Sequence, residues 1–157
     1  MQPQLHSRWW QSSLARFVSS LCLILITTVQ SVLGVDCPTN YTNLYGDRCY
    51  LISLANYDWS GYRAFCQTSG ADLVSIHSQE EHDAIRAALP MCCWYWIGLG
   101  CDASNNPYWS DDTPFDYNNM EYACPSSIVG YAIEQEIDQW DTYNLTDFNA
   151  YGVCATA

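Results

Sequence analysis

The chain has 157 residues, of which 17 are acidic and only five are lysine or arginine, so its formal net charge is −12 at pH 7. This length suits one domain rather than two. Nucleic acid and anionic membrane surfaces would repel such a chain, and we therefore expect neither as a partner. The acidic balance also favours solubility, and on its own it indicates nothing more specific about function.

The first 34 residues have the pattern of a secretory signal peptide. Arg8 and Arg16 precede or border an apolar stretch at 17–26, and Val32 and Gly34 supply the small residues that a signal peptidase requires. The apolar core is about ten residues long, whereas a membrane-spanning helix needs roughly 20. We therefore expect this segment to be removed and the mature chain to be secreted without membrane insertion. An uncleaved anchor is the alternative.

The mature chain, 35–157, carries an even number of cysteines. In a small secreted domain this count predicts a disulfide framework, and no Cys-x-x-Cys spacing indicates a zinc site. Two sequons beginning at Asn40 and Asn144 predict a glycoprotein. The cysteines concerned are Cys37, Cys49, Cys66, Cys92, Cys93, Cys101, Cys124 and Cys154.

The first half of the mature chain predicts a hairpin, a helix and a strand in that order. A turn-rich stretch at 37–49 leads into apolar residues at 50–52, which indicates a hairpin stapled at its base. Aromatic residues and a cysteine recur at helical spacing over 58–68, and Gly70 ends this helix. The short apolar run 73–76 predicts a strand.

The second half begins with another helix and continues with short strands. Ser78 and Glu81 have the capping-box spacing, so the helix should run from Ser78 to Leu89, where Pro90 ends it. Strands are expected at 94–99, 130–134 and 151–154, with a long loop at 101–128. Glu134, Glu136 and Asp138 alternate, as on a solvent-exposed sheet face. Two helices and several short antiparallel strands predict an α+β domain.

The order and spacing of these features resemble a C-type lectin domain over essentially all of 37–157. The resemblance implies a sheet flanked by two helices, a long loop that carries ligand binding, and the disulfide bonds Cys37–Cys49 and Cys66–Cys154. It rests on Cys37-Pro38, Cys49-Tyr50, Trp59 with Cys66 seven residues later, the segment 70–78, Glu81, Trp96-Ile97-Gly98-Leu99, Trp109-Ser110-Asp111 with Pro114, Trp140 and Cys154.

The chain departs from this family at the calcium motif. Sugar-binding members use Glu-Pro-Asn or Gln-Pro-Asp on the loop and Trp-Asn-Asp on a later strand, where this chain has Cys124-Pro125-Ser126 and Trp140-Asp141-Thr142. Calcium takes about six to eight oxygen ligands, and of these positions only Asp141 keeps a strong one. We therefore expect no calcium cofactor at the usual site and assign no metal ligands. A non-standard calcium site among the loop acids Asp102, Asp111, Asp112, Asp116 and Glu121 is an open alternative.

The second disulfide that is usual in the family also lacks both partners here. If 94–99 is extended, Cys93 and Cys101 lie roughly 25 Å apart at about 3.3 Å per residue. A disulfide requires Cα atoms within about 7 Å, so Cys124 is the better partner for Cys101. Cys92 and Cys93 are left as a vicinal pair or as thiols for another chain.

The ligand candidates lie in or beside the long loop. Its exposed aromatics could stack on sugar rings, whereas Trp94, Trp96, Trp109 and Trp140 are expected in the core, and His77 and His82 in an ordinary strand-to-helix turn. No serine, histidine and acid occur in a known catalytic context, so we expect no enzyme. The candidates are Tyr108, Asp111, Asp112, Asp116, Tyr117, Asn118, Asn119, Glu121, Tyr122 and Asp141.

These observations predict a secreted extracellular recognition module. We expect it to bind carbohydrate or a glycoconjugate on a cell or microbial surface without the usual calcium-bridged motif. The alternative is a protein-binding or structural module that binds no sugar.

Overall fold

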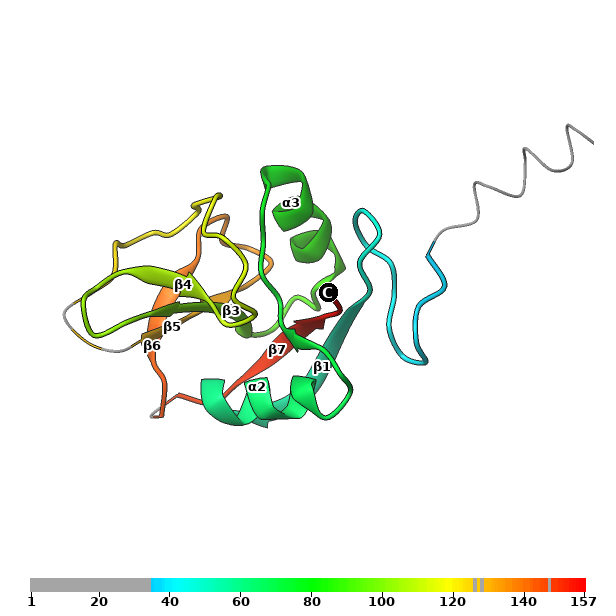
Figure 1. Cartoon of the computed structure of the whole chain (residues 1–157), viewed down its shortest axis with the longest axis horizontal. Coiled ribbons are helices and arrows are strands. Elements are labelled where there is room, and N and C mark those ends of the chain that lie inside the picture. The colour runs from blue at the N-terminus through cyan, green and yellow to red at the C-terminus, as the bar shows by residue number, and fades with distance from the viewer. Residues whose placement is uncertain (1–34, 126, 128, 147) are drawn as a thin grey trace, which may run out of the picture. The chain divides into compact units, whose positions relative to one another are not determined.

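The computed structural model describes residues 35–125, 127, 129–146 and 148–157 (Figure 1). The expected signal peptide and Ser126 lie outside the described residues. Among the residues that are described, no helix is both long and apolar enough to cross a membrane. The elements are β1 Tyr50–Tyr57, α2 Trp59–Gln67, β2 Asp72–Leu73, α3 Gln79–Ala88, β3 Tyr95–Cys101, β4 Pro107–Trp109, β5 Val129–Ile133, β6 Asp141–Asn144 and β7 Ala150–Ala155.

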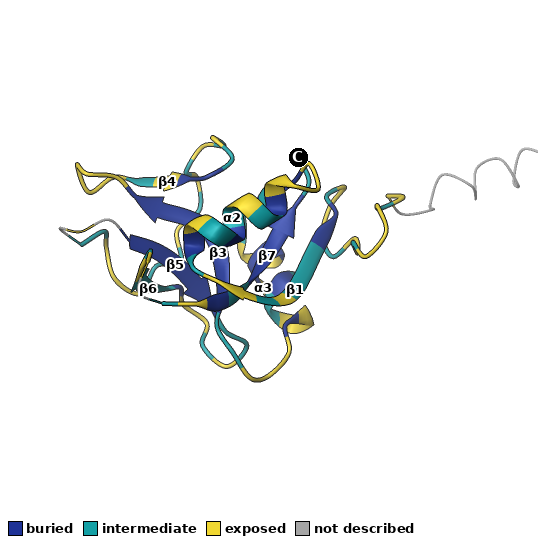
Figure 2. Ribbon diagram, turned by 90° about the horizontal axis from the view of Figure 1, so that it is seen from below, coloured by how far each residue is buried: buried dark blue, intermediate teal, exposed yellow. Residues whose placement is uncertain are grey.

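The strands form one sheet in the order β1-β7-β3-β5-β6, with β2 paired to β7 and β4 paired to β3. All of these pairs are antiparallel except β3 and β7, which run parallel with Tyr95 opposite Tyr151. Figure 2 shows β3, β5 and β7 buried along most of their length. The α+β class predicted from the sequence is confirmed.

Two hydrophobic clusters occupy the two faces of this sheet. Side chains alternate along a strand, so Ile97 and Leu99 pack with Ile85 of α3, while Trp96 packs with Trp59 of α2. The backbones cross closely between β3 and the chain after β2, because a Cβ at Gly98 would lie only 2.7 Å from the carbonyl oxygen of Leu73. The glycine in this strand is therefore required by the packing.

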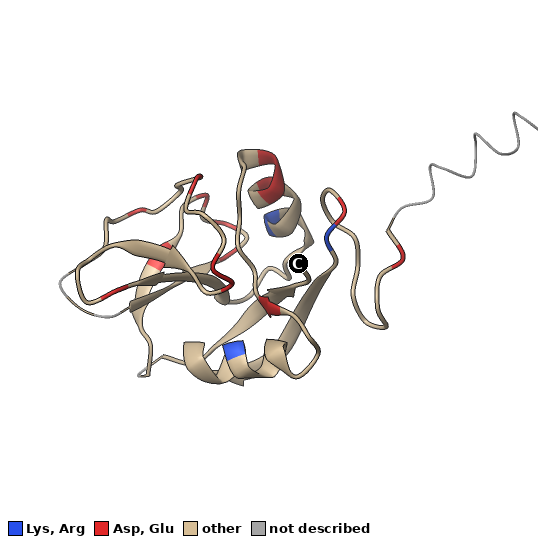
Figure 3. Cartoon of the chain, viewed as in Figure 1, with Lys and Arg blue, Asp and Glu red and all other residues tan. Residues whose placement is uncertain are grey.

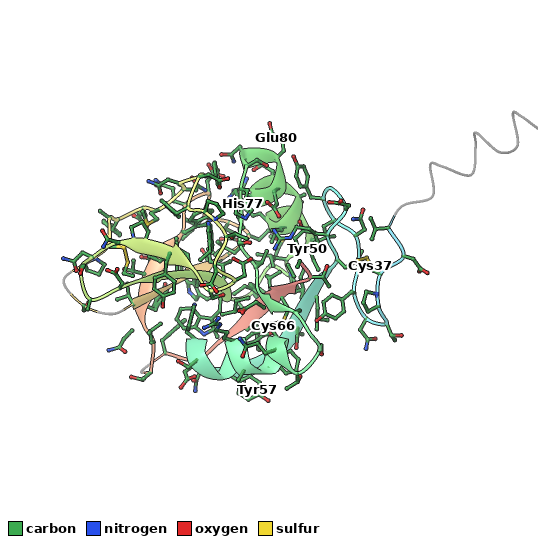
Figure 4. All side chains as sticks on the ribbon, in the orientation of Figure 1. Cys37, Tyr50, Tyr57, Cys66, His77 and Glu80 are labelled. Atoms are coloured by element: carbon green, nitrogen blue, oxygen red, sulfur yellow. A yellow bond between two sulfur atoms is a disulfide. The ribbon has the colours of Figure 1, made fainter. Side chains whose placement is uncertain are left out.

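Helix α2 begins and ends close to the predicted bounds. The Asp58 carboxylate caps it by accepting a hydrogen bond of 2.7 Å from the Gly61 N–H. Its buried face carries Trp59, Tyr62 and Cys66, and Cys66 is bonded to Cys154 of β7 (Figure 4). The helix is thereby fixed to the last strand.

Helix α3 is capped by Ser78, whose hydroxyl oxygen accepts a hydrogen bond from the Glu81 N–H. The buried Glu81 carboxylate accepts from the His77 N–H at 2.9 Å, rather than from the Ser78 N–H as a regular capping box requires. Its other oxygen accepts from the Arg48 guanidinium at 2.8 Å and the Tyr50 hydroxyl at 2.7 Å. Burial, and then the Glu81 carboxylate, raise the pKa of Tyr50. This carboxylate joins α3 to β1 with both oxygens paired.

Three predicted elements differ from the structure. The hairpin predicted at 37–49 is present only as one antiparallel bridge, Thr42 to Tyr50, with the Cys37–Cys49 disulfide beside it. The strand predicted at 73–76 is regular only over Asp72–Leu73, after which the Val74 N–H still donates to the Val153 carbonyl. Strand β5 ends at Ile133, so Glu134, Glu136 and Asp138 lie in irregular chain, where Asp138 pairs with Arg86.

Four disulfide bonds cross-link the described chain. Three join positions that are distant in sequence: Cys37–Cys49, Cys66–Cys154 and Cys101–Cys124, with separations of 12, 88 and 23 residues. The fourth joins the neighbours Cys92 and Cys93, so the structure has the vicinal pair and not two free thiols.

The buried Trp140 connects the long loop to α3. Its ring contacts Trp109 and Tyr117, and its indole N–H donates to Nδ1 of His82 at 3.1 Å. The Trp140 N–H donates to the Asn119 carbonyl, and the Glu121 N–H donates to the Trp140 carbonyl. Residues 119–121 of the loop are therefore held through one tryptophan.

This contact fixes the protonation of His82. An indole nitrogen only donates, so Nδ1 of His82 is unprotonated and the imidazole carries its proton on Nε2. Burial lowers the pKa of His82, although the carboxylates of Asp138 and Asp83 act in the opposite direction. A second proton on Nδ1 would face the Trp140 N–H and remove the hydrogen bond.

We predict that a long-range disulfide stabilises the domain more when the loop that it closes contains more residues. In the chain-entropy model, Cys66→Ser with Cys154→Ser lowers the free energy of unfolding by about 4–5 kcal/mol, and Cys37→Ser with Cys49→Ser by about 3 kcal/mol. The Cys92–Cys93 bond encloses no loop, so Cys92→Ser with Cys93→Ser should lower the free energy of unfolding very little. Denaturant unfolding of the three double variants measures this, and equal losses in all three would contradict it.

We also predict an acid-dependent loss of stability at His82. Its folded pKa lies below the unfolded value of 6.5, so its contribution is complete above pH 6.5 and is lost as the pH falls through the folded pKa. The slope cannot exceed about 1.4 kcal/mol per pH unit, since one proton is involved. His82→Asn keeps an acceptor for Trp140 but cannot titrate, so its unfolding curve should lose this component. If His82→Asn unfolds with the same pH dependence as the unaltered protein, the assignment is refuted. His77→Gln is the control, because it leaves His82 in place and should keep the component assigned to His82.

Candidate functional site

The long loop starts and ends at a disulfide bond. Cys101, the last residue of β3, is buried and bonded to Cys124, at the position where sugar-binding relatives have the first residue of the calcium motif. A sulfur held in a disulfide is a poor ligand for calcium, which prefers charged oxygens. The remaining residues of this motif are Pro125, which has no side-chain oxygen that could bind calcium, and Ser126, which lies outside the described residues.

Asp141 begins β6 and holds the second motif position. One carboxylate oxygen accepts from the Thr142 N–H at 2.7 Å and the other from the Tyr143 hydroxyl at 3.2 Å. Both oxygens are thus engaged within β6. The residues present at the two motif positions do not fit the calcium ion that binds sugar in the family.

The other loop acids that could have formed a different calcium site do not converge. Asp111 accepts from the hydroxyls of Ser75 and Thr113 and lies 3.9 Å from Arg48. Burial raises the pKa of Asp111, but these hydrogen bonds outweigh it and the net pKa is lowered. Asp111 therefore connects the start of the loop to the segment before α3.

Asp116 and Asp102 each serve a local contact. Asp116 lies 2.7 Å from Nδ1 of His77, and this hydrogen bond lowers the pKa of the Asp116 carboxyl group. Asp102 accepts from the backbone N–H groups of Asn106 and Ser104, which lowers its pKa and closes the turn after β3. Asp112 is exposed at the following turn, with φ of 62°.

The side chains of Tyr117, Asn118 and Asn119 all make hydrogen bonds. The Tyr117 hydroxyl donates to the Gln79 side chain of α3, and its ring packs on Trp140. Asn119 donates to the Asp138 carbonyl, and the Asn118 side chain accepts from the Met120 N–H. Tyr117 and Asn119 thus connect the loop to neighbouring segments, whereas Asn118 is exposed and makes only a local contact within the loop.

Only one group of described residues places three potential metal ligands within reach, with all ligand atoms within 4.8 Å: His82, Asp83 and Asp138. Nδ1 of His82 already accepts the Trp140 N–H, so a metal at Nε2 would leave neither ring nitrogen protonated and would require an imidazolate anion. The Arg86 guanidinium also lies 3.2 Å from Asp138. We therefore do not assign a metal to this group.

The remaining candidates gather on the surface beside β6. We name Glu121, Tyr122, Asp141 and Tyr143 the β6 face. Tyr122 is 59% exposed, and the adjacent Glu121 carboxylate raises its pKa. Burial raises the pKa of Tyr143, and the charges of Asp141, Glu134 and Glu121 raise it further, which places all three acids around one phenol. The sequence pattern did not indicate the role of Glu134 here.

Tyr108 lies elsewhere, on β4. Its ring covers Gly100 of β3, where a Cβ would lie 2.9 Å from the phenol ring. It is 38% exposed and has no carboxylate partner among the described residues. The structure thus brings Tyr122 and Asp141 together but leaves Tyr108 apart from them.

The charge of the loop half is entirely acidic. No lysine or arginine follows Arg86 in the sequence. Figure 3 accordingly shows acidic residues over the loop and the basic residues only near β1, α2 and α3. A cleft of about 570 Å³, lined in part by the loop residues 110–113, has its two arginines paired, Arg63 with Asp72 and Arg48 with Glu81.

Comparison with known proteins gives the family. The model of the Lectin C-type domain matches residues 55–155. One chain of the snaclec coagulation factor IX/factor X-binding protein of Gloydius halys is 30% identical over 138 residues, covering 81% of this chain and 90% of that protein. C-type lectin domain family 2 member D3 of Rattus norvegicus is 34% identical over 85 residues, which are 54% of this chain but only 32% of the relative.

Two solved structures resemble the described fold. A calcium-independent type II antifreeze protein superposes with a TM-score of 0.70 at 28% identity, covering 80% of this chain and 98% of the other. The Ca²⁺-independent C-type lectin SPL-2 of Saxidomus purpuratus gives 0.64 at 26% identity, covering 76% and 93%. With the sheet, the two helices and the disulfide from α2 to β7, these matches show that the chain belongs to the C-type lectin domain family.

Proposed function

We propose that this chain is a calcium-independent recognition module that binds neutral sugar rings of glycoconjugates through the β6 face. The observation that carries the proposal is the donor set at the two motif positions: Cys124 is bonded to Cys101, and Asp141 has both oxygens engaged. Without a calcium ion, sugar hydroxyls must be bound by side chains directly. The β6 face offers the groups for this.

The chemistry of the β6 face suits an uncharged sugar. An exposed phenol such as Tyr122 can stack on the apolar C–H face of a pyranose ring. The Glu121 carboxylate beside it can accept hydrogen bonds from sugar hydroxyls, and hydrogen bonds to charged groups are stronger than neutral ones. The surrounding negative charge would repel sialylated or sulfated glycans.

The proposal includes the setting of the domain. We propose cleavage after residue 34, secretion, and glycosylation at Asn40 and Asn144, both of which are exposed. We assign no catalytic residue. The antifreeze protein and SPL-2 are calcium-independent members of the same fold, which supports the same property here.

A basic protein ligand is the second candidate, and the charge distribution favours it. The chain carries no cation after Arg86, so the loop half presents a surface of one sign. The relative from Gloydius halys is named for binding coagulation factors, so its named partners are proteins. Its association rate should fall steeply as salt is added, whereas neutral sugar binding should not.

We predict that binding to a neutral glycan array is unchanged by a calcium chelator. Tyr122→Ala should weaken it about tenfold through loss of the stacking contact, and Tyr108→Ala should not change it. Chelator-sensitive binding would refute the calcium independence. Binding that survives Tyr122→Ala would refute the β6 face as the site. Absence of glycan binding, together with salt-sensitive binding to a basic protein, would establish the alternative.

A further inference from the structure

The vicinal disulfide Cys92–Cys93 has no evident structural purpose. The other three disulfides join positions at least 12 residues apart, whereas this bond joins neighbours. In the chain-entropy model a bond that encloses no loop stabilises very little. It does, however, form a small rigid ring whose sulfur atoms are polarisable and apolar, and Cys92 is exposed.

This ring lines a cleft of about 300 Å³ at one end of the sheet. Strand register explains why distant segments meet there: Tyr57 of β1 is opposite Ala150 of β7, and Tyr151 of β7 is opposite Tyr95 of β3. The end of β1, the start of β7 and the chain before β3 therefore lie side by side. The lining is Asn56, Cys92, Cys93, Trp94, Phe148, Asn149, Ala150 and Tyr151.

Among the described residues, the lining contains no charged side chain, although the chain as a whole carries a net charge of −12. The other described clefts all contain carboxylates, and the one on the opposite side of the vicinal pair includes Glu134 and Glu136. Moving an ion from water into a cleft with no opposite charge is costly, so the cleft selects against charged ligands. A neutral ligand fits it.

The polar groups around the cleft define that ligand further. Four polar side chains of the lining make no hydrogen bond with any described residue: Asn56, Trp94, Asn149 and Tyr151. Two amides, an indole N–H and a hydroxyl are therefore available to a ligand. The aromatic rings and the disulfide provide a flat apolar wall beside them. A ring with one apolar C–H face and hydroxyls at its edge satisfies both requirements.

From this arrangement we propose that the cleft at Cys92–Cys93 is a second binding site, specific for one neutral pyranose ring. Its volume is at the lower end of the range of about 300–1,000 Å³ for small-molecule sites, which admits a single ring. It uses none of the four residues of the β6 face and so goes beyond the function proposed above. Trp94 contacts Tyr143 at 5.2 Å between ring centres, so the two sites adjoin and a longer saccharide reaches both.

The test is a titration of the mature protein with methyl glycosides of glucose, mannose, galactose and N-acetylglucosamine, followed by nuclear magnetic resonance. The signals observed are the Trp94 indole N–H and the side-chain amides of Asn56 and Asn149. At least one sugar should shift them saturably, with a millimolar dissociation constant. Asn149→Ala, and separately Cys92→Ser with Cys93→Ser, should weaken this about tenfold, as expected for losing one well-placed contact.

The control separates this site from the β6 face. Tyr122→Ala should leave the Trp94 shift unchanged, and unfolding curves check that each variant is folded. If none of the four sugars shifts these signals, the proposal is overturned. Shifts that persist in both cleft variants also overturn it. Shifts that disappear only in Tyr122→Ala overturn it as well and would support the β6 face alone. Loss in the cleft variants only would support the second site, whatever the β6 face binds.

Discussion

The position of the long loop depends on the contact between Trp140 and His82. The indole is fully buried, and its N–H is satisfied by a histidine that must stay neutral to accept it. Through its backbone the same tryptophan holds residues 119–121, and its ring supports Tyr117. The residues around the β6 face are therefore placed by a buried polar pair.

Two acids near this pair have partners within the protein. Asp138 lies beside His82 and pairs with Arg86, and Asp111 is held by hydroxyls and the loop backbone. These two carboxylates are therefore already engaged. The Cys101–Cys124 bond adds a covalent closure at the base of the same loop. Hydrogen bonds and a disulfide together hold the described part of this loop.

How far the sequence predicts the structure depends on the range of each interaction. Helices α2 and α3 follow from local signals, because Asp58 and Ser78 cap their own first turns. The hairpin predicted at 37–49 is reduced to one bridge, and the alternating acids at 134–138 lie beyond the end of β5 instead of on a sheet face. His82 was interpreted as an ordinary turn residue, since nothing in the sequence shows that Trp140, 58 residues away, donates to it. The grouping of Tyr122 with Asp141, and the isolation of Tyr108, likewise depend on strand register.

The distribution of charge gives the β6 face and the cleft at Cys92–Cys93 different chemical character. The β6 face surrounds its phenols with carboxylates and so favours hydroxyl donors or cations, while the cleft at Cys92–Cys93 has no ionisable carboxylate or guanidinium. These two surfaces meet at the contact between Tyr143 and Trp94, and Phe148 stacks on Tyr143 at 4.2 Å between ring centres. A continuous aromatic path therefore runs from an acidic end to a neutral end. Since aromatic rings bind the apolar faces of sugars and the flanking polar groups select their edges, this path has the composition that the two proposed saccharide sites require.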